Sequence, residues 1–205
     1  MANSDCGSDN GSDNGSSSTS GGIPTARNVD HVGITVPDLE EAIAFFEDAL
    51  GCETIYQATP PVDDSVQDWM HRNLGVHPES TMRLARLRCG PTTNVELLEY
   101  DDPTQTDEHP KNSDAGAAHL AFFVEDVDAA VAYLEGIDGV ELQGEPRYNE
   151  EGPEEGQVFV YFRAPWGLQL ELIFTPDDVG YTKSTDARAF GPAPEWDAEP
   201  SWSSE

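Results

Sequence analysis

The segments "HVGITVPDLEEAIAFFEDALG" (31–51) and "HLAFFVEDVDAAVAYLEGIDG" (119–139) align over their whole length without a gap. Each begins with a histidine, continues as an apolar strand, and then repeats apolar residues at helical spacing. Asp38 and Asp126 occupy matching positions typical of helix N-caps, and a glycine follows each predicted helix where a helix is expected to end. The repeat therefore predicts two copies of a strand-helix unit.

Three further strands are expected after each helix, because apolar and polar residues alternate in short segments. In the first half they cover 52–59, 81–88 and 94–100; in the second half they cover 140–148, 157–165 and 168–174. A partly helical insertion is expected around Val66 to Leu74. The sequence thus predicts an α+β fold of two βαβββ modules, at 28–101 and 116–176.

The two ends of the chain differ in composition from these modules. Residues 1–26 repeat the unit GSDN and contain few apolar side chains, so we expect an acidic-polar disordered leader. Residues 27–176 form the predicted folded domain. Residues 177–205 are rich in Pro, Ser and acidic residues but retain aromatic side chains, so we expect a tail that covers the domain or a partner subunit.

Charge excludes several classes of partner. The chain has 40 acidic and 10 basic residues, with a formal net charge of -30, and such a surface repels phosphate backbones. No segment has the apolar length of a membrane helix, and the N-terminus lacks the features of a secretory signal. We therefore predict a cytoplasmic protein that binds neither nucleic acid nor membrane. The acidic surface also suits a halophilic protein, because salt screens its self-repulsion.

The cysteines indicate neither a disulfide framework nor a thiolate zinc site. There are three of them, Cys6, Cys52 and Cys89, with no CxxC spacing. An odd number without paired spacing is unusual for either kind of site.

Strand alternation places chemically useful residues on one face of each predicted sheet. The apolar side chains of the first strand in each module share the face that packs on the helix, which leaves His31 and His119 on the other face. In the last strand of each module, Glu96 and Glu171 have the same parity. Buried separately, two carboxylates and two imidazoles would be costly to desolvate. A shared divalent cation removes this objection, since two nitrogen and two oxygen ligands suit such an ion.

Three arginines fall within "MRLARLR" (82–88), which is unusual in so acidic a chain. Arg86 and Arg88 share a face, and Arg83 lies opposite if the strand is regular. One interpretation is that Arg83 and Arg86 bind a carboxylate or phosphate of an anionic small molecule. The alternative is that these arginines pair with local acidic residues or with solvent.

The quoted repeat, together with "NVELLEY" (94–100) and "PWGLQLELI" (165–173), resembles the vicinal oxygen chelate superfamily. This superfamily includes glyoxalase I, methylmalonyl-CoA epimerase, extradiol dioxygenases and antibiotic-resistance proteins. The resemblance implies a curved, cleft-lined mixed β-sheet and one divalent metal ion. Its implied ligands are His31, Glu96, His119 and Glu171, which are compatible with Zn, Ni, Co, Mn or Fe. Such sites form within one chain or across a homodimer.

The resemblance implies a metal-dependent isomerase or lyase that acts by enolate-type proton transfer. We expect Glu171 to be the base and Glu96 the second acid/base, in an enzyme most like methylmalonyl-CoA epimerase. One departure favours a glyoxalase I-type lyase that acts on a thiol adduct: no carboxylate occurs between Thr81 and Arg88, where an epimerase can carry one. An extradiol-type dioxygenase and a metal-free resistance protein that binds a ligand are further alternatives.

Overall fold

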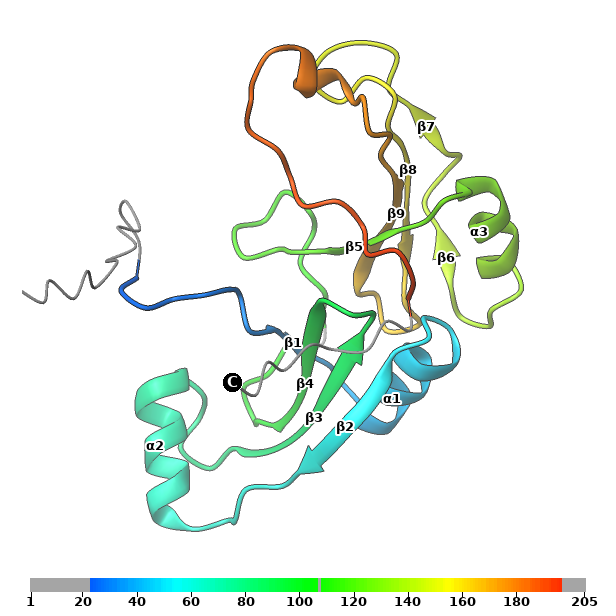
Figure 1. The fold of residues 1–205 in the computed structure, drawn as a ribbon. Helices are drawn as coiled ribbons and strands as arrows, with labels where there is room; N and C mark the ends of the chain where they lie inside the picture. The colour runs from blue at the N-terminus through cyan, green and yellow to red at the C-terminus, as the bar shows by residue number, and fades with distance from the viewer. Residues whose placement is uncertain (1–22, 107, 197–205) are drawn as a thin grey trace, which may run out of the picture.

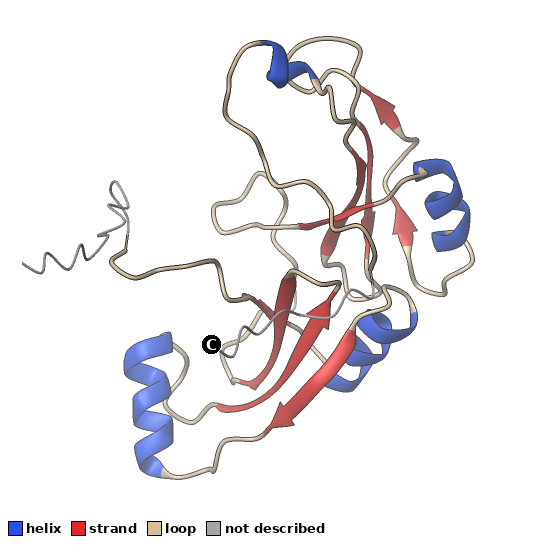
Figure 2. Ribbon diagram, viewed as in Figure 1, coloured by secondary structure: helices blue, strands red, loops and turns tan. Residues whose placement is uncertain are grey.

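The computed structural model describes residues 23–106 and 108–196 (Figures 1 and 2). The first module contains β1 (Val32–Thr35), α1 (Leu39–Asp48), β2 (Glu53–Ala58), α2 (Asp64–Leu74), β3 (Thr81–Cys89) and β4 (Thr93–Asp101). The second contains β5 (Leu120–Phe123), α3 (Val127–Leu134), β6 (Glu141–Leu142), β7 (Arg147–Tyr148), β8 (Val158–Arg163) and β9 (Gln169–Phe174), followed by the 3-10 helix η1 (Gly180–Lys183). Most of the predicted leader, residues 1–22, lies outside the described residues, as does the end of the tail from residue 197.

Each module forms its own mixed sheet, and the two sheets have matching strand orders. The first has the order β1-β4-β3-β2, and the second has β5-β9-β8-β6 with β7 also paired to β8. The first strand of each module runs parallel to the last, and the other pairs are antiparallel. The predicted α+β fold with a repeated unit is confirmed. The strand expected at 140–148 is divided into β6 and β7, because the chain turns at Gly144, which has a φ of 96°.

The helix ends are as the repeat predicts. The Asp38 side chain accepts a hydrogen bond from the Glu41 amide at 2.8 Å, and Asp126 caps α3 in the same way. Gly51 and Gly139 both adopt positive φ, at 68° and 80°, a conformation that glycine adopts without strain. The same local signals therefore start and end the helix in each module.

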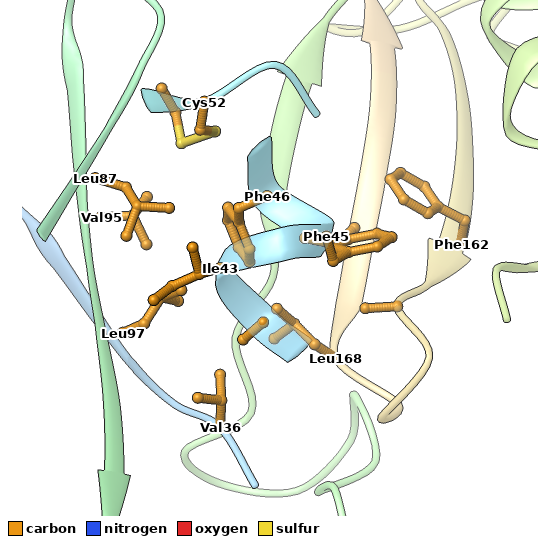
Figure 3. Packing of buried hydrophobic residues seen from close by; sticks show 14 of the residues in the cluster. Val36, Ile43, Phe45, Phe46, Cys52, Leu87, Val95, Leu97, Phe162 and Leu168 are labelled. Atoms are coloured by element: carbon orange, nitrogen blue, oxygen red, sulfur yellow. A yellow bond between two sulfur atoms is a disulfide. The ribbon is translucent and has the colours of Figure 1, made fainter. Parts of the chain in front are cut away.

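Helix α1 lies between the two modules and is packed on both sides (Figure 3). One of its faces packs against the first sheet, where Phe46 is fully buried. Phe45 points the other way, toward Phe162 and Leu168 of the second module, and its ring lies 5.4 Å edge-on from that of Trp166. Burial of these side chains joins the modules in one core. The helix-bearing faces therefore meet at α1, and the opposite face of each sheet, called here its open face, is turned away from it.

A disulfide joins Cys52 and Cys89 across the start of β2 and the end of β3, which corrects the expectation that no disulfide would be present. The two cysteines are 37 residues apart in sequence, but β-pairing of Glu53 with Arg88 brings their Cα atoms to 4.4 Å. Such a separation is within the range that a disulfide spans. Spacing along the chain could not reveal this pair, because the strand register creates it.

The C-terminal tail crosses from the second module back to the first. Trp196 donates a hydrogen bond from Nε1 to the Gly51 carbonyl at 2.9 Å, and its ring centroid lies 6.4 Å from that of Phe122. The tail thus contacts both modules at the disulfide end of the first sheet. Across residues 23–106 and 108–196, no helix has both the length and the apolar character needed to cross a bilayer.

Candidate metal and active site

His31 and Glu96 form a pair on the open face of the first sheet. His31 directly precedes β1, and Glu96 lies on the neighbouring strand β4, paired in register with Gly33. The His31 Nε2 atom is 3.5 Å from Glu96 Oε2. Strand parity predicted this pair, and the two side chains lie together as expected.

Two further charged residues surround this first pair. The His31 ring places Nδ1 2.8 Å from Asp30 Oδ2, and Arg86 donates a hydrogen bond to the same Asp30 oxygen. Arg86 Nη1 also lies 3.9 Å from Glu96 Oε1. Hydrogen bonds from His31 and from Arg86 hold the pKa of Asp30 below its ordinary value, so this carboxylate stays ionised.

His119 and Glu171 form the matching pair on the open face of the second sheet. The His119 Nε2 atom lies 3.0 Å from Glu171 Oε2, and Glu171 is paired with Ala121 of β5 in the register that Gly33 and Glu96 share. Tyr161 of β8 is opposite Glu171, and its ring meets the His119 ring edge-on at 5.4 Å. An imidazole and a carboxylate are thus brought together a second time, but beside an aromatic side chain.

Glu171 lies in a buried environment that shifts the pKa of its carboxyl. Only 7% of the residue is exposed, and burial raises the pKa of its carboxyl, although the nearby His119 partly offsets this effect. Burial and the charge of Glu171 also raise the pKa of Tyr161. A carboxylate with a raised pKa is a stronger base than one in water, so Glu171 is suited to accept a proton.

The arginines of β3 are already paired with acidic side chains. Arg83 lies on the helix-bearing face, as strand parity predicts, and binds Glu40 at 2.5 Å and Glu99 at 2.5 Å. Arg88 binds Glu53 at 2.7 Å. Arg83 is therefore on the opposite side of the sheet from the first His–Glu pair. Of the two predicted substrate-binding residues, Arg83 and Arg86, only Arg86 lies beside the first His–Glu pair.

A cavity of about 370 Å³ lies beside His119, between β1 and the segment that connects the modules. His119, His109 and Trp166 line it, together with apolar residues of β1 and β5. No lysine or arginine is present among the described residues that line the cavity.

One chain does not bring the four predicted ligands into a single cluster. Among residues 23–106 and 108–196, no group of three or more His, Cys, Asp or Glu side chains is placed to hold a metal ion. The reason is architectural, because the first pair lies on one sheet and the second pair on the other, and α1 packs between the two modules. Each pair still offers one imidazole nitrogen and one carboxylate oxygen, a donor type that Zn, Ni, Co, Mn and Fe accept.

Reasoning from the sequence missed Asp30 and Tyr161. Asp30 directly precedes His31, whereas Ala118 precedes His119, so comparison of the two repeats could have drawn attention to it. Tyr161 is found only through the β8–β9 register, which places it opposite Glu171. Arg86 holds the equivalent place opposite Glu96.

Known proteins resemble this chain in both sequence and structure. Residues 30–162 match the Glyoxalase/Bleomycin resistance protein/Dioxygenase superfamily. A protein from Actinomyces sp. named 2-epi-5-epi-valiolone epimerase is 46% identical over 178 residues, which cover 87% of this chain and 96% of that protein.

Two solved structures share the fold at lower sequence identity. A glyoxalase family protein from Bacillus cereus is 23% identical, with a TM-score of 0.57 over 75% of this chain and 99% of that one. A second glyoxalase family protein, from Enterococcus faecalis, is 22% identical, with a TM-score of 0.51 over 72% of this chain and 97% of that one.

Proposed function

This chain belongs to the glyoxalase/bleomycin resistance/dioxygenase superfamily, and from that premise we propose that it is a divalent-metal-dependent epimerase. Its substrate is a small, uncharged ketone of the valiolone type, and the reaction inverts a carbon atom next to the carbonyl. The observation that carries the proposal is the repeated His–Glu pair, one on each open face, with one of the two glutamates buried.

The ligands of the metal ion in this proposal are His31, Glu96, His119 and Glu171. A divalent cation bound there would supply a Lewis acid, which stabilises negative charge on two adjacent substrate oxygens as the α-proton leaves. Nitrogen and carboxylate donors leave the choice among Zn, Ni, Co, Mn and Fe open.

Two copies of the chain complete the site in this proposal. Because one chain holds its pairs on faces that point away from α1, the first pair of one copy meets the second pair of the other. A two-fold dimer of this kind contains two such sites, since a symmetric interface repeats every contact.

Glu171 removes the proton in the proposed reaction. Burial raises the pKa of its carboxyl, which suits a base, and cleavage of the C–H bond transfers the proton to its carboxylate while the electron pair moves toward the carbonyl. Glu96 returns a proton to the opposite face of the same carbon. One C–H bond is broken and another is formed, so the substrate and product differ only in configuration.

Charge around the site favours an uncharged substrate over a coenzyme A thioester. Arg86 is paired with Asp30 and lies near Glu96, and Arg88 is bound to Glu53. The cavity beside His119 has no lysine or arginine among its described lining residues. A phosphate-bearing substrate would have to compete for paired arginines on a chain of net charge -30. We therefore place the valiolone-type ketone ahead of methylmalonyl-CoA.

Metal analysis and isotope exchange test the proposed reaction. The purified full chain should contain a divalent metal and exchange the α-hydrogen of 2-epi-5-epi-valiolone for deuterium in D₂O, and chelation should abolish the exchange. Methylmalonyl-CoA and the hemithioacetal of methylglyoxal with glutathione serve as comparison substrates. Faster conversion of either of these substrates, or exchange that survives chelation, would contradict the proposal.

Mixing two inactive variants tests whether two copies share the site. His31→Ala and Glu171→Gln each damage a different half of it, so a mixed dimer would have one intact site and one doubly damaged site. Random pairing should restore about one quarter of wild-type activity, because half of the dimers are mixed and each keeps one of two sites. A site contained within one chain would give no recovery.

A further inference from the structure

We propose that Asp30 and Arg86 are positioning residues that fix the His31 imidazole in the form that binds a metal ion. Asp30 keeps the proton of the ring on Nδ1, and a hydrogen bond from Arg86 keeps the Asp30 carboxylate in place. This inference rests on the proposed role of His31 as a ligand.

The position of the proton follows from the chemistry of the two groups. An ionised carboxylate only accepts hydrogen bonds, so a 2.8 Å contact between Asp30 Oδ2 and His31 Nδ1 requires the proton to be on Nδ1. A neutral imidazole carries one N–H, which leaves a lone pair on Nε2. That nitrogen is the atom turned toward Glu96. In this tautomer Nε2 is the nitrogen that would bind a metal ion.

Arg86 and Asn94 restrain Asp30, although the Asp30 side chain is 68% exposed. The Arg86 guanidinium donates to the Asp30 carboxylate that His31 also contacts, while Asn94 Nδ2 donates to the Asp30 carbonyl at 2.9 Å. Arg86 itself is only 15% exposed and also faces Glu96. The Arg86 guanidinium therefore lies near both ligands of the first pair: it holds Asp30, which contacts His31, and it also faces Glu96. It can do both because its several donors lie in one rigid plane.

The second module has different residues at the positions of Asp30 and Arg86. Ala118 and Tyr161 stand at the positions equivalent to Asp30 and Arg86, and His119 turns Nε2 to within 3.0 Å of Glu171. Within residues 23–106 and 108–196, a side-chain hydrogen-bond acceptor beside Nδ1 is found for His31 but not for His119. A partner on the second imidazole nitrogen commonly fixes the tautomer of a metal-binding histidine.

Nitrogen NMR of the full chain without metal measures the tautomer of His31 directly. At mildly alkaline pH, where free imidazole is neutral, the wild-type spectrum should show a protonated Nδ1 and an unprotonated Nε2, assigned by comparison with His31→Ala. Asp30→Ala should shift the proton toward Nε2. Asp30→Asn retains an acceptor oxygen and should keep the wild-type tautomer.

Calorimetric titration with Zn²⁺ alone provides the second readout. Asp30→Ala should weaken Zn²⁺ binding by about 10- to 100-fold, as removal of such a partner does elsewhere, and Asp30→Asn should recover most of the affinity. Glu53→Gln is the matched control, because Glu53 is similarly exposed at 64% and pairs with an arginine of β3 but does not contact His31. It should leave both tautomer and affinity unchanged.

The two readouts separate this inference from the proposed function. An unchanged His31 tautomer in Asp30→Ala, or an Asp30→Asn variant that behaves like Asp30→Ala, would overturn the positioning role. A Glu53→Gln variant with the same loss would overturn it as well, since general charge would then explain the effect. Failure of the wild-type chain to bind Zn²⁺ or any other divalent ion would overturn the proposed function, whereas the tautomer measurement does not depend on metal.

Discussion

The first and second His–Glu pairs have the same ligand types in the same register but different supporting side chains. Asp30 and Arg86 lie beside the first pair, whereas Tyr161 lies beside the second, in which Glu171 is buried. A guanidinium keeps a nearby carboxylate ionised, but burial makes a carboxylate hold its proton more tightly. The comparison teaches that two pairs with the same residue types and register can have different electrostatic surroundings, one with a guanidinium nearby and one with a buried carboxyl.

The largest expected effect comes from removing each carboxylate in turn. Glu171→Gln should lower the rate of α-hydrogen exchange by about 10²- to 10⁴-fold, because an amide cannot accept the proton. Glu96→Gln should weaken metal binding but leave the Glu171 base in place, so added metal should restore part of its exchange rate. Exchange rates measured over a metal titration distinguish the two variants. Equal losses that do not respond to metal would show that the pairs are not specialised.

The disulfide provides a stability comparison between the modules. Val140 and Ala164 occupy the positions of Cys52 and Cys89 in the second module. The double variant Cys52→Val, Cys89→Ala should lower the free energy of unfolding by about 3 to 4 kcal/mol, because closing a loop of this length restricts the unfolded chain. Denaturant unfolding measures the loss, and a reducing agent should destabilise only the wild-type chain. Equal stability of the two proteins would contradict this account.

Exchanging the residue opposite the buried glutamate tests the electrostatic part of the comparison. Burial raises the pKa of Glu171, so we expect activity to fall as pH drops through that raised pKa, because the protonated carboxyl cannot accept the substrate proton. Tyr161→Arg should move this acid limb to lower pH and reduce the rate at neutral pH by about tenfold, because a nearby cation weakens the base. The pH profile of exchange measures both effects. Tyr161→Phe is the control and should leave the limb near its wild-type position.

The smallest expected effect concerns the repeated surface ion pair. Glu53 lies 2.7 Å from Arg88, and Glu141 lies 3.7 Å from Arg163 at the matching place in the second module. Glu53→Gln and Glu141→Gln should each change stability by less than about 1 kcal/mol, since exposed pairs contribute little. The stability change caused by each substitution should shrink as salt is added, because salt screens both ion pairs. Thermal unfolding of the wild type and the two variants in a salt series measures these stability changes. The net charge of -30 predicts that salt stabilises all three proteins.

Much of the fold could be predicted from the repeat. The alignment of residues 31–51 with 119–139 predicted both helices, their aspartate caps and the face of each sheet that carries His31 or His119, because these features depend on local spacing. Parity also predicted that Arg83 faces away from Arg86. Each His–Glu pair was predicted for the same reason.

The arrangement between modules could not be predicted in this way. Parity specifies which face of a sheet a side chain occupies, but not that Phe45 of the first module packs against the second. The Cys52–Cys89 disulfide and the place of Tyr161 opposite Glu171 depend on strand register. Register is determined by pairing between distant segments, so a single sequence reveals it poorly.

The repeated ion pair, Glu53 with Arg88 and Glu141 with Arg163, has an evolutionary consequence. A half-length ancestor that carried it would assemble from identical halves, and every substitution would then alter both His–Glu pairs at once. Two modules joined in one chain do not have that constraint, because a substitution in one module leaves the other unchanged. Asp30 and Arg86 therefore stand beside one pair and Tyr161 beside the other, an asymmetry that two identical halves could not have.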